Sequence, residues 1–464
     1  MLTEVVPETS RDQKLVLSIA VLASFVTFLD GSVINVALPA IREELGGGLS
    51  VQQWVVDAYL VTLGTLILLA GSLSDAFGRM LVLRVGLIGF AATSLAIALA
   101  PTAELLIVLR GLQGVAGALL VPSSLALIIS NFRGAAQARA IGQWTGWTSA
   151  AFLAGPILGG LFVDFLSWRL VFAINILPIA VTLVLMARLG QKNVRPAGAG
   201  IDWLGAVLGI VGLGGPVFAL IEQGNFGWNN PVIWVPCVVG ILALTVFVLR
   251  QKTAKHPMLP LGLFAVRNFS VGNVATALIY AALSLGGFLV SVYLQQVAGF
   301  SATAAGLAFL PMTLINIGLS SRFGTLAGRY GPRLFMSLGP IVGGVGYLLM
   351  LSTGEKVDYW WQVLPGVLIF AIGLSATVAP LTAAILGSIP EQQSGIGSAI
   401  NNAVSRIAGL VSIALVGVIL GGPLDVDSFH RGLVFTAVLL FAGGFVSWVG
   451  IRNATRVNDS AIPG

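Results

Sequence analysis

The sequence predicts an all-α integral membrane protein with 14 transmembrane helices, arranged as two six-helix pseudo-repeat bundles plus two inserted helices. Of its 464 residues, 57% are apolar and only 9% are Asp, Glu, Lys or Arg. A soluble domain carries about 25% charged residues, so these charges are too few to cover the surface of a soluble protein. Glycine is frequent, at 58 residues, which fits helices whose backbones approach closely in lipid.

The predicted spans are apolar runs that are separated by short polar connections. A span needs about 20 mostly apolar residues, and no connection is large enough to fold as a separate domain. The runs lie at 15–38, 51–73, 80–100, 103–129, 139–163, 168–188, 202–222, 231–250, 268–294, 303–321, 334–352, 361–387, 394–420 and 431–451.

The distribution of basic residues sets the orientation, because cytoplasmic segments of membrane proteins are enriched in Lys and Arg. With the N-terminus inside, most of the 24 basic residues fall in cytoplasmic segments. On the external side of the membrane lie only Arg42, Arg169, Lys356 and Arg431. An even number of spans then places both termini in the cytoplasm. The expected location is the cell membrane (plasma or inner), which the chain crosses many times.

The composition excludes several other classes of protein. A single cysteine, Cys237, rules out an intramolecular disulfide and a multi-cysteine metal site. The net charge of +6 is spread between apolar runs rather than along a basic stripe, so nucleic acid is not an expected partner. The sequence contains no metal-ligand cluster, nucleophile motif or nucleotide loop of the form GxxxxGK(S/T), so we expect neither an enzyme nor a resident cofactor.

A weak internal repeat divides the chain into two halves. Residues 71–79 (GSLSDAFGR) follow the second predicted span, and residues 324–333 (GTLAGRYGPR) follow the tenth. We therefore predict an N-terminal six-helix bundle at 1–195, two inserted spans at 196–255 and a C-terminal six-helix bundle at 256–464. Parallel halves of this kind are a feature of transporters, whose substrate site lies between the halves near the middle of the membrane.

Five motifs occur in order with this topology. They are residues 29–39 (LDGSVINVALP), 53–59 (QWVVDAY), 71–84 (GSLSDAFGRMLVLR), 109–114 (LRGLQG) and 155–160 (GPILGG). In these motifs, and over most of its length, the sequence resembles the major facilitator superfamily and, within it, the 14-span drug:proton antiporters. The resemblance implies export of hydrophobic or amphiphilic compounds such as drugs, dyes and antibiotics by alternating access. It also implies a monomer that is driven by the proton gradient and needs no cofactor.

Four charged residues lie deep within the predicted spans, namely Asp30, Asp57, Arg110 and Arg406. At a rise of about 1.5 Å per residue, all four fall in one slab in the outer half of the membrane. Ionisable residues at such depth are costly and are functional candidates. They form either two structural ion pairs or a proton-coupling site, in which Asp30 is the principal proton carrier, Asp57 is an accessory one and Arg110 biases their protonation.

The loop after the second span is a candidate conformational latch. Asp75 would pair with a basic partner near a helix N-terminus and hold one state shut, with Arg79, Gly71 and Gly78 completing the turn. A solvated loop is the alternative interpretation. Gly328 replaces the carboxylate in the second copy, so the latch is expected in the first half only.

The fifth span carries the motif that the resemblance associates with antiporters. Pro156 removes a backbone donor and favours a bend, and the small residues allow close helix packing. They are interpreted either as ordinary packing residues or as part of the conformational exchange. The motif residues are Gly155, Pro156, Gly159 and Gly160.

Polar and aromatic residues of the spans are candidates for a largely apolar substrate cavity, although such aromatic residues also commonly pack or face lipid. The acids of the second half fall in loops or at span ends, which favours neutral, zwitterionic or monovalent cationic amphiphiles over dicationic ones. Glu222, at the end of the seventh span, is expected to be solvated. The cavity candidates are Gln143, Trp144, Trp147, Tyr280, Asn316, Asn402 and Arg406.

Two alternatives to a broad drug exporter remain at this point. One is an exporter dedicated to a single natural product or lipid, which differs in the breadth of its substrates. The other is a membrane sensor that binds compounds without moving them. A sensor would leave the acids within the spans unexplained, and the chain contains no separate signalling domain.

Overall fold

The structure is a computed structural model, and it describes residues 10–189, 200–255, 257–390 and 393–453. All regular secondary structure in these residues is helical. The first group of helices is α1 (Arg11–Leu45), α2 (Leu49–Phe77), α3 (Arg79–Ala98), α4 (Ala103–Ala118), α5 (Leu120–Asn131), α6 (Gly134–Phe165), α7 (Leu170–Ala173) and α8 (Ile176–Leu189).

A hairpin and a second group of helices complete the fold. The hairpin consists of α9 (Trp203–Phe226) and α10 (Pro231–Thr253). The second group is α11 (Arg267–Gln296), α12 (Ala302–Leu307), α13 (Leu310–Tyr330), α14 (Pro332–Leu349), α15 (Leu364–Leu386), α16 (Ser394–Ala414), α17 (Val416–Leu420) and α18 (Val426–Gly450). Three short helical turns connect them, at Leu261–Ala265, Met350–Ser352 and Tyr359–Val363.

Each predicted span coincides with one helix or with two consecutive ones. Twelve helical segments of the described residues are long and apolar enough to cross a membrane. The predicted spans 139–163 and 394–420 form α6 and α16–α17, which lie outside these twelve. In α16, polar residues that include Asn401, Asn402 and Arg406 lower the hydropathy. This helix packs against α2 and α11, so its polar residues need not face lipid.

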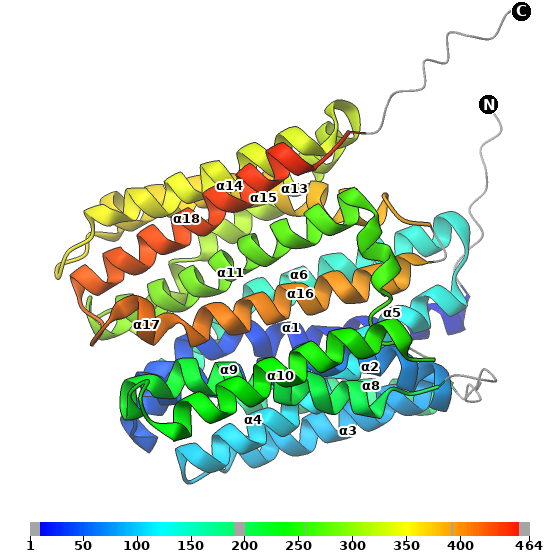
Figure 1. Cartoon of the computed structure of the whole chain (residues 1–464), viewed down its shortest axis with the longest axis horizontal. Helices are drawn as coiled ribbons and strands as arrows, with labels where there is room; N and C mark the ends of the chain where they lie inside the picture. The colour runs from blue at the N-terminus through cyan, green and yellow to red at the C-terminus, as the bar shows by residue number, and fades with distance from the viewer. Residues whose placement is uncertain (1–9, 190–199, 256, 391–392, 454–464) are drawn as a thin grey trace, which may run out of the picture.

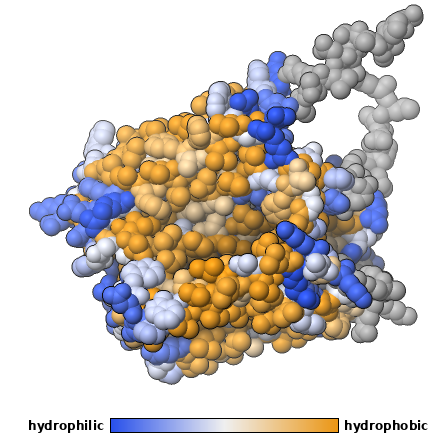
Figure 2. All heavy atoms as spheres, in the orientation of Figure 1, coloured by the Kyte–Doolittle hydropathy of each residue, from blue (hydrophilic) through white to orange (hydrophobic). Residues whose placement is uncertain are grey.

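The surface has the distribution of polarity that a membrane protein needs. Figure 2 shows a broad apolar band across this face, between two ends that carry the polar residues. Large apolar side chains of the hairpin are half exposed, such as Leu242 and Val246 on α10. In water such a surface would be unstable, whereas lipid solvates it. The protein is therefore a multi-pass, all-helical membrane protein.

The helices form two bundles that lie side by side (Figure 1). In the first, α1 packs against α5, α6 and α8, and α2 packs against α4. In the second, α14 packs against α15 and α18, and α11 packs against α16 and α18. The hairpin attaches through α9, which contacts α2 of the first bundle and α16–α17 of the second. The predicted domain boundaries at 195 and 256 fall on residues outside those the structure describes.

Two glycine turns reproduce the internal repeat. Gly78 ends α2 and begins α3 with φ 92° and ψ 137°, and Gly331 ends α13 and begins α14 with φ 90° and ψ 151°. Positive φ is accessible to glycine without the steric cost that a side chain would impose. Both copies of the motif therefore use glycine to reverse the chain between two long helices.

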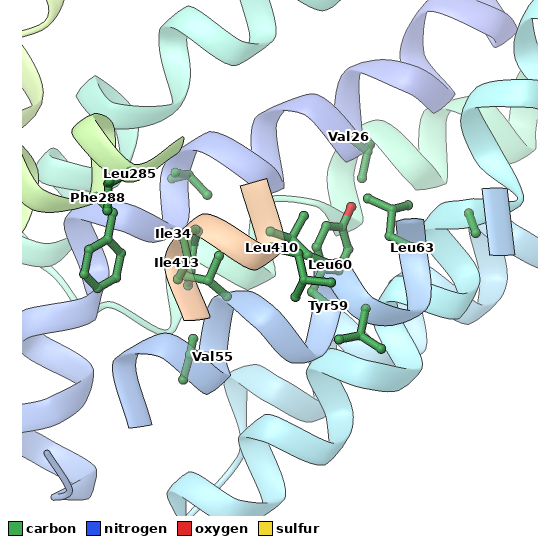
Figure 3. Packing of buried hydrophobic residues seen from close by; sticks show 14 of the residues in the cluster. Val26, Ile34, Val55, Tyr59, Leu60, Leu63, Leu285, Phe288, Leu410 and Ile413 are labelled. Carbon is green, nitrogen blue, oxygen red and sulfur yellow. The ribbon is translucent and has the colours of Figure 1, made fainter. Parts of the chain in front are cut away.

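Three helix pairs make the largest contacts between the bundles. They are α1 with α11, α2 with α16, and α6 with α12. Figure 3 shows Leu410 and Ile413 of α16 beside Val55 and Leu60 of α2. These four side chains are at most 9% exposed, so the two bundles share part of one apolar core. This core lies next to the charged residues that the sequence singles out.

Candidate transport site

A buried polar network centres on Arg110 of α4, whose side chain is 1% exposed. Its Nη1 donates to Oδ2 of Asp30 at 2.6 Å and to Oε1 of Gln113 at 2.6 Å, and its Nε donates to the carbonyl oxygen of Val55 at 2.9 Å. The guanidinium carbon lies 4.3 Å from the centre of the Tyr59 ring. This buried arginine is thus paired with a carboxylate, as its desolvation cost requires.

The second carboxylate oxygen of Asp30 is held from two other directions. Its Oδ1 accepts from Nε2 of Gln113 at 3.2 Å and from Nδ2 of Asn175 at 3.0 Å. Both amides also donate to Oγ of Ser94, at 2.9 and 3.4 Å. The network therefore connects α1, α3, α4 and the break between α7 and α8. A change in the protonation of Asp30 would alter the hydrogen bonds to all of these elements.

Asp57 of α2 lies apart from this network. It is 0% exposed, and neither of its carboxylate oxygens has a hydrogen-bond partner among the described residues. One turn earlier on the same face, Gln53 donates to the carbonyl oxygens of Ile413 and Ala414 at 2.6 and 3.1 Å. Burying an unpaired carboxylate is costly, and binding a proton removes that cost.

Arg406 of α16 lies between the bundles. Its guanidinium carbon is 5.4 Å from the centre of the Phe28 ring, and a Cβ added at Gly31 would lie 3.7 Å from its Nη1. Within the described ranges it forms no ion pair. The interpretation of two structural ion pairs is therefore wrong for these residues: Asp30 and Arg110 form one pair, while Asp57 and Arg406 stay unpaired.

The fifth-span motif faces two helices at once. A Cβ added at Gly155 or Gly159 would lie within 3 Å of Ser32 or Val33 of α1. On another face of α6, a Cβ at Gly160 would lie 2.5 Å from Cα of Thr303 on α12.

The contact between α6 and α12 is close from both sides. A Cβ added at Gly306 of α12 would lie 2.2 Å from the carbonyl oxygen of Pro156. Asp164, also on α6, accepts from the backbone N–H groups of Ala302 and Thr303 at 3.0 and 2.7 Å. The small residues thus let α6 pack against α1 within its bundle and against α12 across the interface.

The contacts between bundles gather at the end that carries the turn between α1 and α2. Arg42 donates to Gln296 at 2.9 Å there, and Ser291 donates to the carbonyl oxygen of Asn35 at 3.3 Å. At the opposite end, a Cβ added at Gly142 of α6 or Gly318 of α13 would meet nothing within 4 Å. Hydrogen bonds therefore join the bundles at the α1–α2 end.

The predicted latch is described only in part. The side chain of Asp75 lies outside the part of the chain that the structure describes. Arg79 is the first residue of α3, Gly78 supplies the turn before it, and a Cβ added at Gly71 would meet nothing within 4 Å. The latch remains a prediction.

The predicted cavity residues lie on α6, α11, α13 and α16. Trp147 is 59% exposed and Gln143 is also exposed, whereas Nε1 of Trp144 donates to Oγ of Ser24 at 2.9 Å, which ties α6 to α1. Oδ1 of Asn316 accepts from Ser320 at 2.6 Å. The remaining three cavity candidates, Tyr280, Asn402 and Arg406, are partly exposed. Their contact with a substrate remains a prediction.

One expectation is corrected. Glu222 is partly buried rather than solvated, and it accepts from Nε1 of Trp54 at 2.7 Å and from Asn225 at 2.7 Å. The reason is that α9 continues to Phe226, beyond the predicted end at 222, so that this carboxylate faces α2.

Ser94, Gln113 and Asn175 were not predicted as site residues. The signal that could have found them is a single polar residue within an apolar run, as Asn175 is in residues 170–180 (LVFAINILPIA). A polar side chain buried among apolar residues needs a partner. Gln113 and Asn175 donate to Asp30, and Ser94 accepts from both of these amides.

Comparison with known proteins agrees with this architecture. The Major Facilitator Superfamily matches residues 20–413. The methylenomycin A resistance protein of Bacillus subtilis is 33% identical over 87% of each chain, and the multidrug efflux pump LfrA of Mycolicibacterium smegmatis is 32% identical over 89% of this chain and 82% of its own. The crystal structure of an auto-inhibited POT family peptide transporter shares the fold, with 15% identity, a TM-score of 0.68 and coverage of 97% and 99%. The chain therefore belongs to the Major Facilitator Superfamily and is a transporter rather than an enzyme.

Proposed function

We propose that this protein is a proton-coupled antiporter that exports hydrophobic or amphiphilic compounds by alternating access. The observation that carries the proposal is the buried carboxylate of Asp30, held by Arg110, Gln113 and Asn175 where four helices of the first bundle meet. A proton on this carboxylate would remove its negative charge and weaken the pair with Arg110. Because α1 also packs against α6 and α11, such a change can reach the interface between the bundles.

Asp57 is proposed as the accessory proton site. It lies on the face of α2 that contacts α16 through Gln53, and its carboxylate has no partner among the described residues. In this proposal a proton entering from outside loads Asp57 or Asp30 while cargo is released. Proton and cargo weaken each other's binding, and by linkage this effect is reciprocal.

The membrane topology is part of the proposal. We infer 14 spans, in which α6 and α16–α17 join the twelve apolar segments, with both termini in the cytoplasm of the cell membrane. The α1–α2 end, where hydrogen bonds join the bundles, then faces outside and is called the closed end. The six-helix bundles (1–195 and 256–464) would move about the closed end, with the inserted spans (196–255) attached through α9, and the transporter would act as a monomer.

The names of the relatives support the proposed cargo. They are a resistance protein for one antibiotic, methylenomycin A, and a multidrug efflux pump. The described residues of the second bundle hold their acids outside the long helices or at their first turns, as with Asp358 and Asp425, which cap helix N-termini. We therefore propose antibiotic-like amphiphiles without two positive charges as cargo. Substrate breadth distinguishes a multidrug pump from a dedicated exporter.

The test uses purified protein in liposomes that contain a pH-sensitive dye. A proton gradient is imposed, a panel of lipophilic antibiotics and dyes is added, and the wild type is compared with Asp30→Asn. Proton movement that depends on substrate and is lost in Asp30→Asn is the expected result. Asp202→Asn, at the start of the hairpin and opposite its turn, is the matched control and should retain coupling. Compounds that bind without any flux would instead indicate a sensor.

A further inference from the structure

We propose that Arg406 binds an acidic group of the cargo, so that the protein preferentially exports amphiphiles that carry a carboxylate, whether anionic or zwitterionic. This inference rests on the proposed function, because it names the substrate class for the same transport site. It concerns a residue that the proton-coupling network of the first bundle does not use.

The first step is the charge around Arg406. Its guanidinium has no carboxylate within 4.0 Å in the described ranges. Asp30, next to Gly31 in the chain, is already engaged with Arg110, Gln113 and Asn175. Arginine stays protonated, and a cation within the membrane is costly without a counter-ion. The described residues supply that counter-ion for Arg110 but not for Arg406.

The second step is the position of Arg406. It projects from α16 toward the first bundle, because its Cβ lies 3.5 Å from a Cβ added at Gly64 of α2 and its Nη1 lies near Gly31 of α1. Neither glycine has a side chain that could cover the guanidinium. In a transporter with two parallel halves, the interface between them near the middle of the membrane is where substrate binds.

The third step is the set of groups beside Arg406. The Phe28 ring lies 5.4 Å from the guanidinium carbon, and a planar aromatic compound can stack on such a ring. Asn402, one turn earlier on α16, is partly exposed, whereas Asn401 is engaged with Asn273 and Thr276 of α11 at 3.2 and 2.8 Å. Arginine binds carboxylate in a bidentate geometry. An apolar, aromatic body with one carboxylate therefore matches the groups present.

The experiment compares a carboxylate-bearing rhodamine dye with its methyl ester, which differ only in that group. Binding to the purified protein is measured by fluorescence anisotropy, and export is measured in liposomes with a proton gradient. The wild type should bind the acid at least about tenfold more tightly than the ester, as expected for a hydrogen bond between charged groups. Arg406→Gln should lose this preference and still bind the ester, and Arg406→Lys should retain part of it.

Two controls make the result decisive. Arg431→Gln removes a charge at the start of α18 and should leave the preference unchanged. Retained ester binding shows that Arg406→Gln is folded. The inference is overturned if the wild type binds neither dye or shows no preference, or if Arg406→Gln keeps it. It is also overturned if the variant weakens both dyes equally, as pairing of Arg406 with Asp30 in another state would do. Binding with the expected preference but without export would contradict the proposed function and leave the inference standing.

Discussion

The two bundles differ in how they hold charge within their long helices. The first contains Asp30 and Arg110 as a buried pair and Asp57 as a buried acid without a partner. In the described part of the second, Arg406 is unpaired, and acids such as Asp358 and Asp425 cap helix N-termini. Among the described residues, the buried carboxylates of the long helices thus belong to the first bundle, and the second presents a permanent cation.

This difference exists on a shared backbone plan. Gly78 and Gly331 make the same turn between the second and third long helices of their bundles. The charge before the turn is not shared, since Gly328 corresponds to Asp75. The positive φ of the turn favours glycine in both copies. The carboxylate before the turn occurs in the first copy only. Four predictions test this division of roles.

The largest effect is expected from Arg110→Gln, which leaves the Asp30 carboxylate buried without its cation. Removing one partner of a buried pair costs about 3–5 kcal/mol, so the variant should unfold at a markedly lower temperature in detergent. The double variant Asp30→Asn/Arg110→Gln should recover part of the loss, because no charge is then unpaired. Arg406→Gln is the comparison from the second bundle and should cost far less. Equal losses for the two arginines would remove the distinction between the bundles.

A smaller effect is expected at the contact between bundles. Gly160→Val places side-chain atoms against Thr303, and overpacking of this kind costs about 1–3 kcal/mol. The cost falls on the state in which α6 touches α12, so the variant should open the α1–α2 end. Distances between spin labels across that end measure this shift, in a background where Cys237 is replaced by serine. Gly146→Val, which faces open space, is the matched control and should behave as the wild type.

The sequence predicted the positions of the helices well, since each predicted span coincides with one helix or with two consecutive ones. A hydrocarbon core about 30 Å thick imposes a length on every helix that crosses it. The sequence did not predict partners. Asp30, Asp57, Arg110 and Arg406 are predicted to share one slab, yet among them the structure pairs only Asp30 with Arg110, since the rotation of each helix about its axis decides which side chains meet. The rotation of a helix depends on its packing, for example on how closely the glycines of α6 approach α1. The sequence pattern of a single helix does not specify this rotation.

The partners that were missed are neutral. Asn175 and Ser94 hold the Asp30 network together, but a single amide or hydroxyl in an apolar run carries no charge to draw attention. Glu222 was placed in solvent because the apolar run ends there, while the helix continues and brings it to Trp54. Such errors arise at helix ends, where hydropathy changes before the backbone does.

Asp57→Asn tests whether the two acids of the first bundle have different roles. Asp57 has no hydrogen-bond partner in the described residues. We therefore expect the asparagine substitution to change the thermal stability in detergent little. We expect proton-coupled export to fall about tenfold, equivalent to about 1.4 kcal/mol, whereas Asp30→Asn abolishes coupling. Initial rates in liposomes measure both. An Asp57→Asn variant with the coupling of the wild type would leave Asp30 as the single carrier.

The smallest effect is expected in the hairpin, which belongs to neither bundle. Asp202 caps α9 through the N–H group of Gly205 at 2.9 Å, and it accepts from Arg250 at 2.9 Å and from Gln251 at 3.2 Å. Burial alone would raise the pKa of Asp202, but these hydrogen bonds outweigh burial and hold its pKa below the usual value. The stabilisation is therefore present above the unfolded pKa of about 3.9 and is lost as pH falls through the lower folded value.

Asp202→Asn removes this charge and keeps a side chain that can cap the helix. At neutral pH it should cost about 0.5–1 kcal/mol, seen as a small drop in unfolding temperature in detergent. The difference from the wild type should shrink progressively as the buffer is taken below about pH 4, because the wild type then loses the stabilisation that its ionised carboxylate provides. A difference that stays constant with pH would show that Asp202 acts through its shape rather than its charge. Proton coupling should be unchanged throughout, since the hairpin contributes no group to the Asp30 network.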